Sequence, residues 1–79
     1  MSGCIIIYVT VPDMETARKI AEDLVKNKLA ACVNISGAVE SVYRWKGAIE
    51  KSSELLLMMK TGKGLFGRVR ERVRELHGN

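Results

Sequence analysis

Residues 29–50, LAACVNISGAVESVYRWKGAIE, constrain the fold of this chain more than any other segment. Small residues open the segment, a run rich in β-branched and aromatic residues follows, and Lys46-Gly47 then separates that run from a second one. Glycine tolerates the positive φ of a tight reversal, so the segment predicts two antiparallel strands joined by a short hairpin turn. Ser36-Gly37 predicts a bulge or kink in the first strand, since an isolated glycine in a strand pattern often marks one.

A strand and a helix are predicted before this segment. Residues 4–11 (CIIIYVTV) form a near-continuous apolar run, which predicts a strand covered on both faces. Pro12 ends that run, Asp13 is a good N-cap, and residues 13–28 carry one apolar stripe at helical spacing. The stripe comprises Ala17, Ile20, Ala21, Leu24 and Val25.

The hairpin itself is predicted over residues 31–35 and 39–45 in its first strand and residues 48–60 in its second. Residues 55–59 are apolar at every position, so this part is expected in the centre of a sheet or in an interface. Residues 61–62, Thr-Gly, are expected to end the strand.

A second helix is predicted over residues 64–77. The order β-α-β-β-α, with a right-handed crossover after the first strand, places the third strand between the other two. Both helices would then cover one face of an antiparallel sheet. This is an α+β fold, a ferredoxin-like split β-α-β sandwich that is one strand short. The inward side of the second helix would comprise Leu65, Phe66, Val69, Val73 and Leu76.

The missing strand predicts self-association. Without it, residues 4–11 form an open edge that carries Ile5, Ile6, Ile7 and Val9. A long apolar edge favours pairing with another chain, and the far face of the sheet has no helix to cover it. Both points predict a homo-oligomer.

Length and cysteine use limit the class of protein. The 79 residues make a single domain, residues 1–79, whose small core favours a stabiliser such as oligomerisation. Cys4 and Cys32 lie in separate apolar runs, which predicts two buried free thiols in a reducing compartment. The first residues lack the basic region of a signal peptide, and no apolar stretch approaches the ~20 residues that span a bilayer. A soluble, cytoplasmic protein without a membrane partner is expected.

The excess of basic residues behind the net charge of +4 lies late in the chain, in Lys60, Lys63 and the four arginines of the last helix. These arginines alternate with residues of other kinds and are partly compensated by Glu71 and Glu75, which indicates a solvated helix surface. Sheets that bind RNA carry stacking aromatics in their central strands, where this chain has aliphatic residues. No nucleic-acid partner is predicted. The arginines are Arg68, Arg70, Arg72 and Arg74.

Six blocks of the sequence occur in the order and spacing of a known family. They are YVTVPD at 8–13, ETA at 15–17, LAACVNI at 29–35, S-x-Y-x-W-x-G-x-IE at 41–50, LLLMMKT at 55–61 and LF at 65–66. With these blocks the chain resembles the CutA family of divalent-cation tolerance proteins over almost all of residues 4–77. The resemblance implies a ferredoxin-like subunit in a tight homotrimer, whose long second and third strands extend sheets across subunit boundaries. It also implies a cytoplasmic location and an association with tolerance of copper and other divalent metals.

The chain departs from the family pattern in two ways. Members usually continue past the second helix with a His-x-Tyr-x-x-Pro-Glu-Ile segment, a fourth strand and a last helix. Here the sequence stops at His77-Gly78-Asn79, so we expect a C-terminally shortened form or a fragment. The copper ligands proposed in some members include a cysteine that matches Val9 and a glutamate beyond the end of this sequence. Only His77 matches a family ligand.

Two residues are metal-ligand candidates, and each also suits a purely structural role. His77 suits the C-terminal end of a helix through the helix dipole, and its imidazole also suits a divalent metal such as copper. Cys32 fits a small core position, and its thiolate is also a soft ligand. Cys4 is expected to be structural.

The hairpin supplies a second candidate site. Tyr43 and Trp45 share one strand face, as expected of core or interface anchors. They would also suit the wall of a cleft between subunits, completed by Glu50, Lys60 and Thr61. Such a cleft would bind a small anion or metabolite.

No catalytic constellation or phosphate loop is visible, so the sequence predicts a protein that is not an enzyme. The leading hypothesis is a homotrimeric metal-binding and response module for copper and other divalent cations. Two alternatives stay open: a PII-like sensor that binds a small metabolite at subunit clefts, and a purely structural oligomerisation module. A metal titration and a metabolite screen would distinguish the three.

Overall fold

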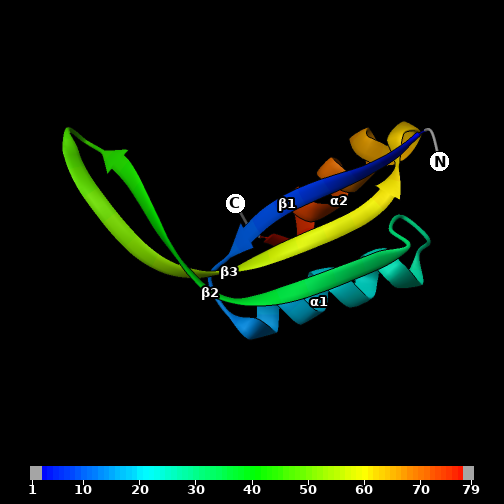
Figure 1. Cartoon of the computed structure of the whole chain (residues 1–79), viewed down its shortest axis with the longest axis horizontal. Helices are drawn as coiled ribbons and strands as arrows, with labels where there is room; N and C mark the ends of the chain where they lie inside the picture. The colour runs from blue at the N-terminus through cyan, green and yellow to red at the C-terminus, as the bar shows by residue number, and fades with distance from the viewer. Residues whose placement is uncertain (1–2, 78–79) are drawn as a thin grey trace.

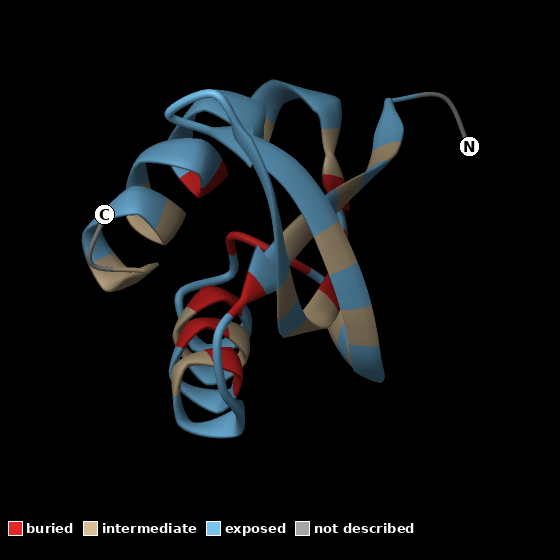
Figure 2. Ribbon diagram, turned by 90° about the vertical axis from the view of Figure 1, so that its left-hand side faces the viewer, coloured by how far each residue is buried: buried red, intermediate tan, exposed pale blue. Residues whose placement is uncertain are grey.

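The structure, a computed structural model, describes residues 3–77. Three antiparallel strands form one sheet in the order β1-β3-β2, and both helices lie on the same side of it (Figures 1 and 2). The predicted ferredoxin-like arrangement is confirmed. Its elements are β1 Cys4–Val11, α1 Met14–Lys26, β2 Cys32–Trp45, β3 Ala48–Gly62, a 3-10 turn Lys63–Leu65 and α2 Phe66–His77.

The core lies between the helices and the sheet. Leu57 and Met59 of the central strand β3 meet Ile20 and Leu24 of α1 and Val69 of α2, and all five are fully buried. The alternation of side chains along β3 brings its odd-numbered residues to the helix side. The small core therefore depends on one strand that has a neighbour on each edge.

Two apolar residues predicted to face inward are exposed instead. Val25 lies at the margin of the α1 stripe, and the chain leaves the helix soon after it. Phe66 is the first residue of α2, and no further element covers that end of the helix within residues 3–77. Both predictions were wrong because periodicity does not show where the neighbouring elements end.

The strands differ from expectation in coverage and length. The burial of β1 alternates, and Ile6 and Tyr8 are 53% and 61% exposed on the sheet face away from the helices, so the strand is not covered on both faces. Thr61 and Gly62 do not end β3. They continue it in register with Ile5 and Cys4 of β1.

Local signals in the turns and caps were read correctly. The Asp13 carboxylate accepts a hydrogen bond of 2.7 Å from the backbone N–H of Thr16, and this contact holds the pKa of that carboxyl below its usual range. A register shift between Ser36 and Ala38 makes Gly37 the extra residue of the predicted bulge.

The hairpin extends well beyond the body of the molecule (Figure 1). The molecule measures 41 × 24 × 21 Å along its principal axes. Lys46 and Gly47 form the reversal with φ of 50° and 81°, so both take the left-handed conformation of a tight hairpin turn. We call residues 39–54 the outer hairpin, because β3 has lost its pairing with β1 there and pairs with β2 alone.

Within the described residues, neither helix is long and apolar enough to cross a membrane.

Candidate functional site

The outer hairpin exposes a group of large apolar side chains, which we call the hairpin patch. Its members are Val42, Tyr43, Trp45 and Ile49, with exposed fractions of 58%, 46%, 59% and 62%. Tyr43 and Trp45 share one strand face, while Val42 and Ile49 lie on the other. Large apolar groups exposed on both faces of a protruding element favour its use as an interaction surface.

A second apolar surface lies on the sheet face away from the helices. Ile6 and Tyr8 of β1 stand there beside Lys60 and Met58 of β3, their partners in the register. Within residues 3–77, no helix covers this face (Figure 2). The molecule thus has two distinct unpartnered apolar surfaces, one on the sheet and one on the outer hairpin.

The predicted cleft residues do not come together within one chain. Tyr43 lies opposite Glu50, and Trp45 is close by at the tip. Lys60 and Thr61 lie at the other end of β3, about 33 Å further along the strand at ~3.3 Å per residue. Thr61 is also buried, and its hydroxyl donates a 2.5 Å hydrogen bond to the Leu29 carbonyl. A cleft with all five residues would need a second chain.

The cysteines are free, as predicted, but neither is buried. Cys4 is exposed and Cys32 is half-buried, with its thiol 3.6 Å from the Asn34 side-chain oxygen. Both lie on strand faces that no helix of residues 3–77 covers, which is why the prediction of core thiols was wrong. Cys4 pairs with Gly62 and Cys32 with Lys60 on opposite edges of β3, so a strand separates the two thiols.

His77 ends α2 and lies against the end of β1. Its Nε2 is 3.0 Å from the Thr10 carbonyl oxygen, a contact that fixes the orientation of the ring. Thr10 is opposite Leu56, four residues from the partner of Cys32 along β3, or about 13 Å. The two metal-ligand candidates therefore do not share a site in one chain. Residues 3–77 also hold no group of three or more His, Cys, Asp or Glu placed to bind a metal.

An ion pair between the helices was missed by the sequence reasoning. Arg72 donates to both carboxylate oxygens of Asp23, through Nε at 2.8 Å and Nη2 at 2.7 Å, and also reaches Glu75 at 3.3 Å. The hydrogen bonds from Arg72 hold the pKa of the Asp23 carboxyl below its usual value of 3.8. The contact joins residues that are 49 apart in the sequence, so local spacing could not predict it. Arg72 was predicted to lie on a solvated helix surface.

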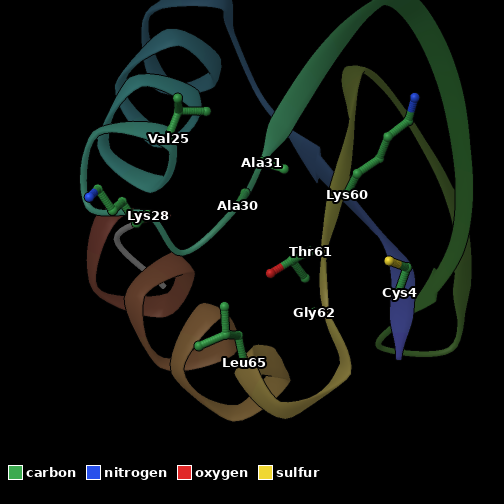
Figure 3. A pocket seen from close by; sticks show the side chains of 9 residues that line it. All are labelled: Cys4, Val25, Lys28, Ala30, Ala31, Lys60, Thr61, Gly62 and Leu65. Carbon is green, nitrogen blue, oxygen red and sulfur yellow. The ribbon is translucent and has the colours of Figure 1, made fainter. Parts of the chain in front are cut away.

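A hollow of about 410 Å³ lies just before the start of β2, beside the last residues of β3 (Figure 3). Val25 and Lys28 line it from the end of α1, Lys60 and Gly62 from β3, and Leu65 from the 3-10 turn. The sequence reasoning missed it, although it named Lys60 and Thr61 as members of a cleft. Here two predicted site residues, Lys60 and Thr61, border a cavity of ligand size within a single chain.

Comparisons with known proteins agree with the fold and the sequence blocks. The divalent-cation tolerance protein CutA of Thermus thermophilus is 47% identical over 72 residues, which cover 91% of this chain and 70% of that protein. The chloroplastic protein CutA of Arabidopsis thaliana is also 47% identical, but this chain covers only 40% of it. This chain is thus shorter than either relative.

Solved structures give the same result. The Thermus thermophilus divalent cation tolerance protein superposes with a TM-score of 0.92 at 45% identity, covering 96% of this chain and 74% of that one. CutA of Xylella fastidiosa gives a TM-score of 0.95 at 36% identity, covering 99% and 75%. The family described as CutA1 divalent ion tolerance protein matches residues 5–79. The chain therefore belongs to the CutA1 family of divalent ion tolerance proteins.

Proposed function

We propose that this chain is a self-associating divalent-cation response protein that works as a homotrimer. The single observation that supports self-association most strongly is the hairpin patch. Full burial of a large aliphatic or aromatic side chain is worth roughly 1.5–3 kcal/mol, and the patch offers four such groups that the chain itself does not cover. Contact of both faces of the outer hairpin with neighbouring chains would recover this free energy.

The two apolar surfaces favour a ring over a dimer built on one shared patch. The hairpin patch and the open face of the sheet are different surfaces on different parts of the molecule. When unlike surfaces meet, each subunit uses one surface on each neighbour, and the contact closes into a ring if the rotation allows it. A ring of two subunits has two-fold symmetry. The smallest ring without it that contacts between two different surfaces can form has three subunits.

The metal role is proposed for the assembly, not for one chain. His77 and Cys32 are the donors with the right chemistry, because imidazole and thiolate both bind copper. Within one chain they stand apart, so any shared ion would take ligands from different subunits. We propose binding as the role of these residues and assign no chemical reaction to the chain.

A metal titration tests that role. We expect the assembled protein to bind Cu(II), and we expect His77→Ala to lower the affinity at least tenfold. Titration calorimetry measures both affinities. Lys51→Gln, on the outer hairpin, is the matched control and should bind as the parent does. Equal affinity in the parent and in both His77→Ala and Cys32→Ser would contradict the metal proposal but leave self-association standing.

We further propose a cytoplasmic location, on the ground that both cysteines are free. The relative from Archaeoglobus fulgidus is described as periplasmic, which concerns that protein. Cell fractionation with an antibody to this chain tests the proposal, and recovery outside the cytoplasm would overturn it.

A further inference from the structure

The hollow at the end of the sheet has features of a small-molecule site that differs from the hairpin patch and from the metal-ligand candidates. Its volume of about 410 Å³ is within the range of small-molecule sites. Its walls are mainly apolar, with Val25 on one side and Leu65 on another, and Ala31 lies between them and the sheet (Figure 3). All of its walls come from one chain, so the site is complete without a partner.

The ladder directs one backbone donor of β3 toward this hollow. In an antiparallel ladder, successive residues direct their N–H and C=O groups to opposite edges of the strand. Lys63 donates to the Gly3 carbonyl on the β1 side, while the Lys60 carbonyl accepts from Ala31 on the β2 side. Gly62 therefore directs its N–H to the β2 side, at a level of the sheet before the first residue of β2. A half-buried N–H of this kind needs an acceptor.

Two lysines flank the same hollow. Lys28 stands at the end of α1 and Lys60 on β3, on either side of Thr61, with their ammonium groups turned outward (Figure 3). Both residues are exposed, so their side chains can swing toward a ligand without unpacking anything. Among residues 3–77, the lining includes no carboxylate to neutralise them. The site is thus positively charged.

Lys28 has a left-handed backbone conformation. Leu29 N–H donates to the Leu24 carbonyl and Lys28 N–H to the Val25 carbonyl, which is the hydrogen-bond pattern of a Schellman helix end. That motif places Lys28 at φ 58°, a position where glycine is usual. Here a long cationic side chain stands where glycine would be less strained.

The geometry points to a binding site for a small anion with an apolar body, of which a short-chain carboxylate is the simplest example. Its carboxylate would accept a hydrogen bond from Gly62 N–H, with Lys28 and Lys60 neutralising the charge. Its alkyl part would lie against Val25 and Leu65. The lining of the hollow includes neither metal-ligand candidate and no residue of the hairpin patch, and Lys60 also borders the open face of the sheet. The anion titration and the mass measurement therefore test separate proposals.

Titrations of the full chain, followed by NMR, test the site. Three probes separate the contribution of the ligand's charge from that of its alkyl chain. Butyrate carries both the charge and the alkyl chain, 1-butanol lacks the charge, and inorganic phosphate lacks the alkyl chain. We expect butyrate to shift the Gly62 amide resonance in a saturable way and to bind at least about tenfold more tightly than the other two. A linear shift that does not saturate, or binding of 1-butanol or of phosphate as tight as that of butyrate, would overturn the proposal.

Three variants locate the binding. Lys28→Gly removes one ammonium group but keeps the left-handed backbone, which glycine favours, and Lys60→Gln removes the other. Each should weaken butyrate binding about tenfold, and Lys51→Gln on the outer hairpin should leave it unchanged. If the two hollow variants keep the parent's circular dichroism spectrum and still bind butyrate as the parent does, the site is wrong.

Discussion

The body of the molecule and the outer hairpin share the strands β2 and β3, but different contacts hold them. In the body, β3 lies between two strands, and its side chains Leu57 and Met59 are fully buried under the helices. In the outer hairpin, β3 pairs with β2 alone, and Trp45 and Ile49 are more than half exposed. A two-stranded ribbon is only marginally stable by itself in water. The body therefore has its stabilising contacts within one chain, whereas the outer hairpin is the part that the proposed assembly would complete.

The largest expected effect comes from the core of the body. Leu57→Ala should lower the free energy of unfolding by about 2–5 kcal/mol, because it leaves a cavity under both helices. Ile49→Ala, on the outer hairpin, should change it by less than about 0.5 kcal/mol in the single chain, since that side chain is already in water. Urea unfolding at a concentration below self-association measures both. Similar losses in the two variants would remove the distinction between the regions.

The buried hydroxyl at the far end of β3 should have the next largest effect. Thr61→Val keeps the shape but removes the donor to the Leu29 carbonyl, which is left unpaired in a buried position. We expect a loss of about 1–3 kcal/mol in the free energy of unfolding, measured by the same urea titration. Ser53→Val, on the exposed outer hairpin, is the control and should have little effect.

The left-handed backbone at Lys28 should give a gain in stability. Lys28→Gly relieves a conformation that costs a side-chain-bearing residue about 1–2 kcal/mol, and the greater flexibility of glycine in the unfolded chain offsets part of this. A net gain of up to about 1 kcal/mol is expected, read as a higher midpoint of thermal unfolding. A lower midpoint would mean that the Lys28 side chain has a packing role in the body.

The smallest effect is expected at the ion pair between the helices, which is half exposed and screened by water. Because Arg72 lowers the pKa of Asp23 in the folded chain, the stability it adds is present above about pH 4. That stability is lost as the pH falls through the lowered pKa. Asp23→Asn should therefore be less stable than the parent at neutral pH and approach it in acid. Parallel curves of unfolding midpoint against pH would exclude this linkage.

Sequence reasoning succeeded where the physical cause is local. Gly47 predicts the turn because the turn requires a positive φ. Asp13 predicts the helix start because its carboxylate accepts from a free backbone N–H, and Gly37 predicts the bulge because it interrupts the strand pairing. Element order then determined the strand order through the handedness of the crossover.

The features that the sequence did not predict depend on contacts between distant residues. Arg72 and Asp23 come into contact only when both helices have packed on the sheet. The hollow forms because β3 extends two residues beyond its pairing with β2. The exposure of Cys4 and Cys32 depends on which faces stay uncovered. Apolar periodicity marks the side chains that need burial, but it does not say whether the same chain or another supplies the cover.

The molar mass in solution tests the central claim most directly, for the parent and for a Trp45→Ser, Ile49→Ser double variant. Light scattering should give three times the 8.8 kDa chain mass for the parent, and the single-chain mass for the variant with an unchanged circular dichroism spectrum of the body. A parent that remains at the mass of one chain throughout the micromolar range would contradict the account. So would a double variant that still has the mass of the trimer.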